Sequence, residues 1–229
     1  MKILLTGASR GLGSGLLEYG ISNNYETVTL GLTNPQKSNR HIHCDLSKLD
    51  QAEEIIKEDL IDKSFDIVFL NAGILGPLDK IQNTTIKSLE SVMEVNLWAN
   101  KIILDQLLSI EAKVKQIVLI SSGASVSGGR GWAGYSLSKA AANMLMQLYA
   151  HEFTGAHLVA LAPGLIESEM QEQIRETNFG EEFPVFKRLK KAKDTADMQS
   201  PLEAAKKIFG VLDKVRELPS GSFADIRKI

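Results

Sequence analysis

The sequence is poor in cysteine, has no long apolar run and carries no excess of either charge. Cys44 is the only cysteine, so no disulfide can form within the chain, which favours a reducing compartment. The apolar run that starts at Ile3 is too short for a secretory signal, and no stretch has the ~20 apolar residues of a membrane helix. Lys and Arg number 26 against 28 Asp and Glu, which argues against nucleic acid as a partner. We therefore expect a cytoplasmic protein that binds neither membranes nor nucleic acid.

Histidine is also scarce, and the four histidines do not form the ligand set of a metal site. His41 and His43 fall on one face of a predicted strand, but no third ligand accompanies them at a suitable spacing. His151 and His157 form no ligand set either. We expect no bound metal and interpret His41 and His43 as ordinary strand residues.

What the sequence does contain is a regular alternation of short apolar strands with apolar-periodic helices and no internal repeat. This alternation predicts a single α/β domain over residues 1–229, with a Rossmann-like, doubly wound parallel sheet and helices on both faces. Ser200 is predicted to cap the last helix, and Asp45 or Ser47 the helix after the third strand. The predicted strands cover 2–5, 27–32, 41–44, 66–70, 116–120, 157–162 and 221–224, and the predicted helices include 84–109, 135–153 and 201–212.

The first predicted strand runs directly into a glycine-rich turn over residues 6–13, which a helix follows. Glycines allow close approach of a ligand to the backbone, and the start of the helix offers unpaired N–H groups and a positive dipole end. The Gly-x-x-x-Gly-x-Gly spacing matches neither the Gly-x-Gly-x-x-Gly fingerprint nor a Walker loop. The alternatives are a flexible turn and a dinucleotide phosphate site, and the position after an N-terminal strand favours the phosphate site.

The second predicted strand ends without the acidic residue that binds the ribose 2′-hydroxyl in many dinucleotide domains, and continues as Leu32-Thr33-Asn34. A missing carboxylate removes the repulsion that would exclude a 2′-phosphate. Arg10 in the glycine turn can supply the matching cation, with Lys37 or Arg40 as further candidates. We therefore expect NADPH to be preferred, with NADH as the alternative, and Asp45 is a candidate adenine contact.

Tyr135 and Lys139 stand four positions apart in a predicted helix, thirteen residues after Ser122. This spacing puts the phenol and the ammonium on one face of the helix, one turn apart. The cation is then expected to lower the pKa of Tyr135 and make the phenol a usable proton donor and acceptor, while Ser122 holds a carbonyl or hydroxyl oxygen. The alternative for the isolated pair is an amphipathic stack with a snorkelling lysine.

Further candidate ligand contacts follow the fourth and sixth predicted strands. Asn71-Ala72-Gly73 and Pro163-Gly164 stand at the carboxyl ends of these strands, where such sheets bind ligands. Asn96 lies between Val95 and Leu97 in the predicted helix 84–109. It is either an active-site amide or a helix residue that bonds locally or to solvent.

Helices 84–109 and 135–153 are apolar on more than one face. One face can cover the sheet and the other a second subunit, which predicts a homodimer or homotetramer. Residues 167–199 are polar and irregular and form a candidate substrate lid. The basic run at 187–193 either attracts an acidic substrate or carrier, or is the surface of a solvated lid helix.

Six motifs, in this order and spacing, make the chain resemble the short-chain dehydrogenase/reductase family over essentially its whole length. They are Thr6-Gly7-x-x-x-Gly11-x-Gly13, Asn71-Ala72-Gly73, Asn96, Ser122, Tyr135-x-x-x-Lys139 and Pro163-Gly164. Monomeric members of that family carry an insertion before the catalytic tyrosine. This chain has none, which agrees with the predicted oligomer.

The resemblance implies a role for each matched residue. Tyr135 is the implied general acid/base, and Lys139 its pKa partner and nicotinamide-ribose anchor. Ser122 is the implied carbonyl-orienting hydroxyl, and Asn96 the holder of a proton-relay water. Thr33 stands where many NADP-dependent members have Arg, and Ser168 replaces the commoner Thr but keeps its hydroxyl. The implied cofactor contacts are Gly7, Ser9, Arg10, Gly11, Leu12, Gly13, Thr33, Asp45, Leu46, Asn71, Ala72, Gly73, Tyr135, Lys139, Pro163, Gly164, Ile166 and Ser168.

The combined expectation is an NADPH-dependent oxidoreductase that reduces the carbonyl of a ketone, diketone or aldehyde to an alcohol by hydride transfer. A 3-oxoacyl thioester on a carrier is the alternative substrate. A non-catalytic dinucleotide sensor or scaffold is the alternative of another class. Trp132, three residues before Tyr135, is the best candidate for the substrate pocket. Leu75, Val126 and Leu165 either line that pocket or belong to the core or a subunit interface.

Overall fold

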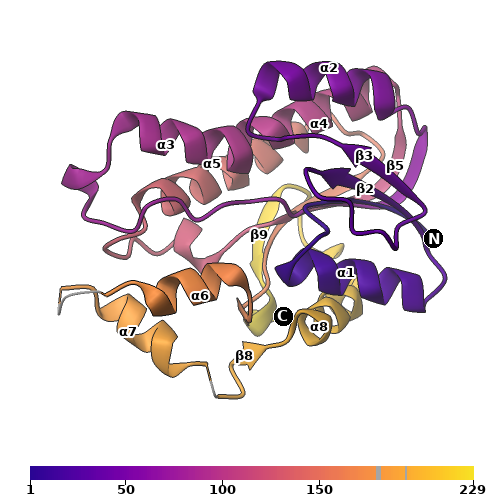
Figure 1. The fold of residues 1–229 in the computed structure, drawn as a ribbon. Coiled ribbons are helices and arrows are strands. Elements are labelled where there is room, and N and C mark those ends of the chain that lie inside the picture. The colour runs from indigo at the N-terminus through magenta and orange to yellow at the C-terminus, as the bar shows by residue number, and fades with distance from the viewer. Residues whose placement is uncertain (179–181, 194) are drawn as a thin grey trace.

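A parallel sheet of seven strands runs through the centre of the structure (Figure 1). The computed structural model describes residues 1–178, 182–193 and 195–229. The chain winds outward in one direction from β1 and in the other from β4, which confirms the predicted doubly wound sheet. In spatial order the strands are β3 (Arg40–His43), β2 (Glu26–Gly31), β1 (Lys2–Thr6), β4 (Ser64–Leu70), β5 (Lys113–Ile120), β6 (His157–Ala162) and β9 (Ser222–Asp225).

Helices cover both faces of this sheet, as predicted. One face carries α1 (Gly11–Ser22) and α8 (Pro201–Val215), and the other carries α2 (Leu49–Asp59), α4 (Ala99–Ser109) and α5 (Ala133–Tyr149) (Figure 1). Successive residues of β1 face opposite layers, since Ile3 and Leu5 pack with α1 and α8 while Leu4 packs on the other side. All three are fully buried, as expected for a parallel strand covered on both faces. No helix among the described residues combines the length and apolar character needed to cross a membrane.

The predicted helix over residues 84–109 changes its geometry at Asn96. It is observed as α3 (Ile86–Met93), a π-helical segment over Glu94–Trp98, and α4. π-Helical turns hold one extra residue per turn and often occur at functional sites. The Asn96 side chain inside this segment is fully buried, so the change of geometry coincides with a buried polar group.

The two predicted helix caps had different outcomes. Ser200 caps α8 as predicted, in a capping box with Glu203. The prediction for α2 was wrong, because its N-cap is Lys48 and makes no side-chain capping bond. Asp45 instead accepts hydrogen bonds from the N–H (3.0 Å) and the hydroxyl (2.7 Å) of Ser47, which close a local turn and lower the pKa of the Asp45 carboxyl.

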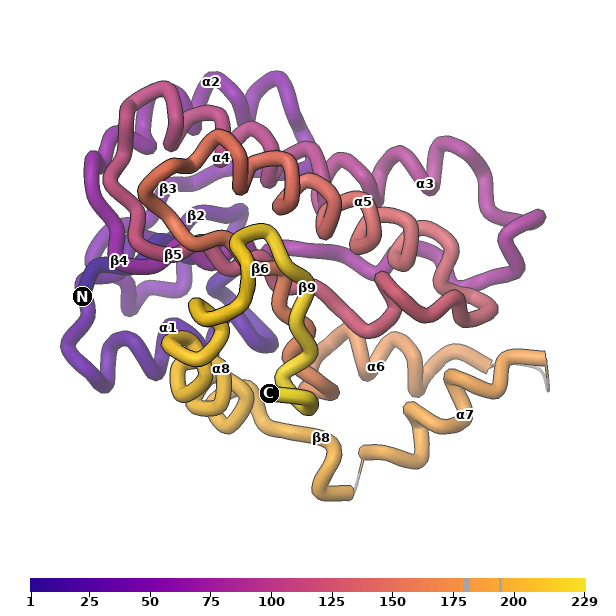
Figure 2. The backbone as a smooth tube through the Cα atoms, turned by 180° about the vertical axis from the view of Figure 1, so that it is seen from behind, coloured from indigo at the N-terminus to yellow at the C-terminus, as the bar shows by residue number. Residues whose placement is uncertain are grey.

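The predicted lid forms a separate layer beyond the carboxyl ends of the strands (Figures 1 and 2). It is helical rather than irregular, with α6 (Glu169–Glu176) and α7 (Pro184–Lys191) between a short parallel pair, β7 (Leu165–Ile166) and β8 (Met198–Gln199). Residues 179–181 and 194 of the predicted range lie outside the described residues. The basic α7 is not simply a solvated helix, because Phe186 and Leu189 are buried.

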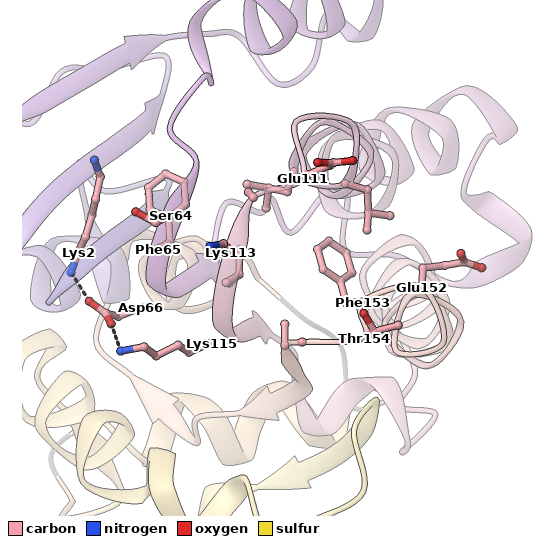
Figure 3. A pocket seen from close by; sticks show the side chains of 16 residues that line it. Lys2, Ser64, Phe65, Asp66, Glu111, Lys113, Lys115, Glu152, Phe153 and Thr154 are labelled. Carbon is pink, nitrogen blue, oxygen red and sulfur yellow. Dashed lines mark hydrogen bonds and ion pairs between the residues drawn. The ribbon is translucent and has the colours of Figure 1, made fainter.

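A hollow of about 570 Å³ lies at the amino ends of β4 and β5, the opposite edge of the sheet (Figure 3). Phe65 and Phe153 are among its apolar lining. Asp66 accepts a hydrogen bond from the Lys2 backbone N–H (2.7 Å) and pairs with the Lys115 ammonium (2.6 Å). Ligands of doubly wound sheets bind at the carboxyl ends of the strands, so this hollow is not the predicted active site.

The close packing of α1 on α8 at Gly15 leads to a stability prediction. An ideal Cβ on Gly15 would lie 2.1 Å from the Pro201 carbonyl oxygen, a backbone atom that cannot turn aside. We expect Gly15→Ala to lower the free energy of unfolding by about 1–3 kcal/mol, as overpacking does. Gly210→Ala is the matched control in α8, where a Cβ meets open space and should raise stability by about 1 kcal/mol. Urea denaturation measures both, and equal stability of the two variants would contradict the close contact.

Candidate active site

The glycine turn after β1 is fastened to the loop after β4. The side-chain amide of Asn71 donates to the carbonyl oxygens of Thr6 and Gly7, both at 3.0 Å. The Thr6 hydroxyl in turn accepts the N–H groups of Asn71 and Ala72, both at 2.9 Å. Gly13 must be glycine, because an ideal Cβ there would lie 2.0 Å from the Gly7 carbonyl oxygen. These predicted cofactor contacts therefore meet at the point where the winding of the sheet changes direction.

The start of α1 fits the pyrophosphate of a dinucleotide. Arg10 is the N-cap residue, makes no side-chain capping bond, and is followed by no acidic residue in the first turn. The N–H groups and the positive dipole of this helix end therefore suit an anion. Gly11 and Ser168 lie together here, with 3.3 Å between the Ser168 Cβ and an ideal Cβ on Gly11. Ser9 and Leu12 belong to the same turn, so the predicted phosphate contacts lie around one helix start.

The residues predicted to contact the adenosine end of the cofactor lie just after β2 and β3. Thr33 follows β2 and is exposed, and Leu46 follows β3 and is buried. Arg10 forms an ion pair with Glu169 at the start of α6. Arg40 is wrong as a candidate phosphate ligand, because it begins β3 at the amino edge and donates to Asp62 at 2.7 Å.

Ser122, Tyr135 and Lys139 come together at the carboxyl end of β5. Ser122 follows this strand after one residue, and Tyr135 and Lys139 lie in the first two turns of α5. The Ser122 hydroxyl lies close enough to the Tyr135 phenol to act on its pKa, and it accepts the N–H of Ala124 at 3.1 Å. The Lys139 Nζ lies 5.8 Å from the centroid of the Tyr135 ring and donates to the Ile120 carbonyl oxygen at 2.6 Å. One phenol, one hydroxyl and one ammonium therefore share this site.

The pKa of Tyr135 is raised, not lowered as the spacing predicts. Burial of the hydroxyl raises the pKa, and the nearby Ser122 hydroxyl offsets this shift only in part. Part of the tyrosine is exposed, but its hydroxyl lies deep enough to be desolvated. The Lys139 ammonium is itself buried, which lowers its own pKa to about 8, and it donates to Ile120 rather than to the phenol. The phenol is therefore protonated at neutral pH.

Asn96 joins α5 to the loop after β4. Its Oδ1 accepts the N–H of Ile74 (2.8 Å), and its Nδ2 donates to the Ile74 carbonyl (2.9 Å) and the Ser138 hydroxyl (2.9 Å). Ser138, which the sequence analysis missed, donates to the carbonyl of Tyr135 (2.9 Å). The Asn96 side chain therefore does not bond locally within its own helix, because its partner Ile74 stands 22 residues away in the sequence. The local alternative was wrong. An ideal Cβ on Gly73 would lie 3.2 Å from Asn96 Oδ1, so this predicted glycine faces the same site.

A second set of polar groups that the sequence analysis missed holds the Ser122 turn. Asn143 accepts from the Ser121 hydroxyl (2.6 Å) and donates to the Ser125 hydroxyl (2.9 Å). Ser125 donates to the Ser122 carbonyl (2.6 Å). The sequence held a signal, since Asn143 follows Lys139 by four positions and so shares its face of the helix.

An aromatic cluster connects the lid to Tyr135. The centroid of the Trp132 ring lies 5.9 Å from that of Tyr135 and 4.8 Å from that of Phe186. Phe183 extends the chain of rings, at 5.8 Å from Phe186. Trp132 therefore lies beside Tyr135, where the sequence analysis expected it. Phe183 and Phe186 were missed, although with Leu189 they recur every third residue, which is a helical period.

Other candidate pocket residues divide between this cluster and the surface. Leu75 is buried in the cluster and Leu165 packs against it. Val126 is 66% exposed, so the alternative that it belongs to the core is wrong in this structure. The remaining predicted nicotinamide contacts follow β6, where Gln199 lies 3.4 Å from the Pro163 carbonyl and Gly164 has a φ of 87°. Ile166 in β7 is buried there.

The parallel sheet, its glycine turn and the Ser–Tyr–Lys site together define a dinucleotide-dependent oxidoreductase. A sequence model of the family described as short chain dehydrogenase matches residues 1–178. The chain belongs to this family and is an NAD(P)-dependent dehydrogenase/reductase.

Relatives in sequence extend over most of the chain. A benzil reductase ((S)-benzoin forming) of Bacillus subtilis (strain 168) is 28% identical over 242 residues and covers 98% of each chain. A benzil reductase of the same description from Saccharomyces cerevisiae is 31% identical and covers 76% of this chain and 75% of its own. A 3-oxoacyl-[acyl-carrier-protein] reductase of Rickettsia prowazekii is 29% identical and covers 76% of each chain.

Solved structures show the same fold. A short chain dehydrogenase/reductase from Saccharomyces cerevisiae has a TM-score of 0.82 at 19% identity and covers 98% of this chain and 95% of that one. The structure of ElxO with NADP bound has a TM-score of 0.76 at 21% identity and covers 98% of this chain and 96% of that one.

The buried ammonium of Lys139 leads to a prediction about stability and pH. Its pKa is about 8 in the folded chain against an ordinary 10.5, so the unfolded chain binds this proton more tightly. The free energy of unfolding contributed by this group is therefore lowest below pH 8, and it rises by on the order of 3 kcal/mol as the pH approaches 10.5. Lys139→Met removes the charge and is expected to abolish that rise.

Urea denaturation from pH 7 to pH 10 measures this effect as the difference between the wild type and Lys139→Met. Lys191→Met is the control, because Lys191 is exposed in α7 and its loss should leave the pH dependence unchanged. Identical pH dependence in the wild type and Lys139→Met would show that the ammonium is not desolvated.

Proposed function

We propose that this protein is an NADPH-dependent carbonyl reductase that acts on aromatic ketones and diketones. The observation that carries the proposal is the grouping of Tyr135 with Ser122 and with the buried Lys139 ammonium, whose Nζ lies 5.8 Å from the centroid of the Tyr135 ring. The aromatic cluster of the lid reaches this same tyrosine. Bound NADPH would supply the hydride in this reaction.

The side chains of the site can complete the reduction that hydride transfer begins. The Ser122 hydroxyl can donate to the carbonyl oxygen and hold it beside Tyr135. As negative charge develops on this oxygen, Tyr135 transfers its hydroxyl proton to it, which yields the alcohol and leaves a phenolate. The hydride on carbon and this proton on oxygen account for the two added hydrogen atoms.

The pKa values of the pair suit this direction of proton transfer. The raised pKa of Tyr135 keeps the proton on the phenol until the substrate oxygen becomes basic. Lys139, with a pKa of about 8, is mostly protonated at pH 7, so its cation stabilises the phenolate that forms. Asn96 and Ser138 hold the backbone around the pair, since Asn96 donates to Ser138 and Ser138 donates to the Tyr135 carbonyl oxygen rather than to its phenol.

NADPH is favoured over NADH by the charges around the proposed ribose site. Arg10 lies at the glycine turn, and residues 32–35 after β2 include no acidic side chain. A solved structure with this fold contains NADP, which supports the proposal. Lys37 is a further candidate cation in the segment after β2.

Aromatic substrates are favoured by the ring of Trp132, which lies beside Tyr135 and is held in place by Phe186. The relatives from Bacillus subtilis and Saccharomyces cerevisiae that are benzil reductases support this choice. A 3-oxoacyl thioester on a carrier is the second candidate. It is favoured by the basic residues in the last turn of α7, which are Arg188, Lys190 and Lys191, and by the Rickettsia prowazekii relative.

We further propose a homodimer or homotetramer built on α3, α4 and α5. Large apolar side chains on α3 and α5 face solvent, including Ile86 (69% exposed), Met144 (52%) and Leu148 (59%). A hollow of about 470 Å³ beside them is lined in part by Trp98 and Leu137. A second copy of the chain would cover this surface, and size-exclusion chromatography with light scattering tests it.

We propose a cytoplasmic location because the single cysteine, Cys44, is a free thiol. Cys44 is buried, and its burial raises the thiol pKa to about 11. Such a thiol is a poor nucleophile at neutral pH, as suits a structural cysteine that stays reduced.

Purified wild type is expected to oxidise NADPH with benzil as substrate. At matched concentrations, it should oxidise NADPH faster than it oxidises NADH. Tyr135→Phe should lower kcat by about 10²–10⁴-fold, because it removes only the transferred proton, while NADPH binding stays within about twofold. Tyr149→Phe is the matched control in the same helix, where the hydroxyl bonds to Asp105 instead. Full turnover by Tyr135→Phe would contradict its role, and NADPH binding by wild type without turnover on any carbonyl would favour the non-catalytic sensor.

The aromatic cluster predicts a selective effect of Trp132→Leu. Loss of one ring contact removes about 0.5–1.5 kcal/mol of stacking, so kcat/KM for benzil should fall up to about 10-fold relative to butane-2,3-dione. The ratio of the two substrates, measured on one preparation, cancels any loss of folded protein. A ratio unchanged from wild type would exclude Trp132 from the substrate pocket, and faster turnover of a 3-oxoacyl thioester than of benzil would favour the second candidate.

A further inference from the structure

One charged contact ties the lid to the glycine turn. Glu169, the first residue of α6, forms an ion pair with Arg10, the N-cap residue of α1. The two residues are 159 positions apart, so only the tertiary fold brings them together. Ser168, the N-cap of α6, lies against Gly11 in the same region. The Glu169 carboxylate is therefore paired with the Arg10 guanidinium at the edge of the proposed cofactor site.

Arg10 is also the cation that the proposed function assigns to the 2′-phosphate of NADPH. A guanidinium binds a carboxylate and a phosphate through the same pairs of N–H donors, so the two anions compete for it. The side chains of Arg10 and Glu169 are 67% and 57% exposed, and water screening makes such a pair weak enough to exchange. A 2′-phosphate that reaches Arg10 also meets the negative charge of Glu169 at short range.

We infer that Glu169 is a specificity-determining residue that weakens NADPH binding relative to NADH by competing for Arg10. NADH has no phosphate at this position, so Glu169 opposes only NADPH. The inference rests on the proposed function, because it assumes that Arg10 receives the 2′-phosphate. Cofactor choice would then depend on the lid, through Glu169, as well as on the glycine turn.

A purely structural role for Glu169 makes a different prediction. An acidic residue in the first turn stabilises a helix through the macrodipole, and Glu169 and Glu172 both occupy that turn of α6. Loss of such a contribution would change the binding of both dinucleotides alike. The lid does not depend on Glu169 alone, since Lys80 pairs with Glu182 at 3.2 Å and Phe186 stays buried.

The test is fluorescence titration of the full chain with NADPH and with NADH. Glu169→Gln keeps the size of the side chain and removes its charge, and is expected to lower the Kd for NADPH about 3- to 10-fold while the Kd for NADH changes less than twofold. Glu172→Gln removes an exposed charge from the same helical turn and should change neither Kd by more than twofold. In an Arg10→Ala background, Glu169→Gln should no longer improve NADPH binding.

Any of the following outcomes would overturn the inference. NADPH binding that is unchanged or weaker in Glu169→Gln excludes competition. Equal gains for NADPH and NADH assign Glu169 a structural role only. If Arg10→Ala weakens NADPH binding but Glu169→Gln has no effect, the inference fails and the proposed cofactor stands. If Arg10→Ala leaves NADPH binding unchanged, the assignment of Arg10 fails and the inference falls with it.

Discussion

The hydrogen bond from the buried Lys139 ammonium to the Ile120 carbonyl is the contact on which the candidate active site depends. No carboxylate accompanies this ammonium among the hydrogen bonds and ion pairs of the described residues, so a single carbonyl oxygen at 2.6 Å takes the place of water. The bond ties α5 to the carboxyl end of β5. Because Tyr135 stands four residues earlier on the same helix, the bond also sets the phenol beside Ser122.

Further contacts around Tyr135 and Lys139 hold the neighbouring elements in place and desolvate the pair. Asn96, in its π-helical segment, binds both backbone groups of Ile74 and the Ser138 hydroxyl, and so joins three elements behind the site. Trp132 and Phe186 pack against each other on the lid side of Tyr135, whose hydroxyl is desolvated by burial. Desolvation then raises one pKa and lowers the other, so a protonated phenol faces a protonated but easily neutralised ammonium. In the proposed reduction, this phenol supplies the proton that the carbonyl oxygen receives.

Local patterns in the sequence predicted the sheet, the helices on both faces and the grouping of Tyr135 with Lys139, because periodicity and spacing act over a few residues. They failed where the outcome depends on distant contacts. The direction of the Tyr135 pKa shift depends on burial, which the spacing of two residues does not contain. Phe186 was hidden in a charged stretch whose buried face appears only against Trp132. Arg10 and Glu169 pair across 159 residues, and no local motif signals such a contact.

The most direct test of this account is an NMR titration of the lysine side-chain resonances, with Lys139 assigned by comparison with the Lys139→Met spectrum. The account predicts that the Lys139 ammonium titrates near pH 8, far below the exposed lysines, and that its protons exchange slowly with water. A midpoint near 10.5, with fast exchange, would mean that the ammonium is solvated. The enclosed Tyr–Lys site described above would then be contradicted.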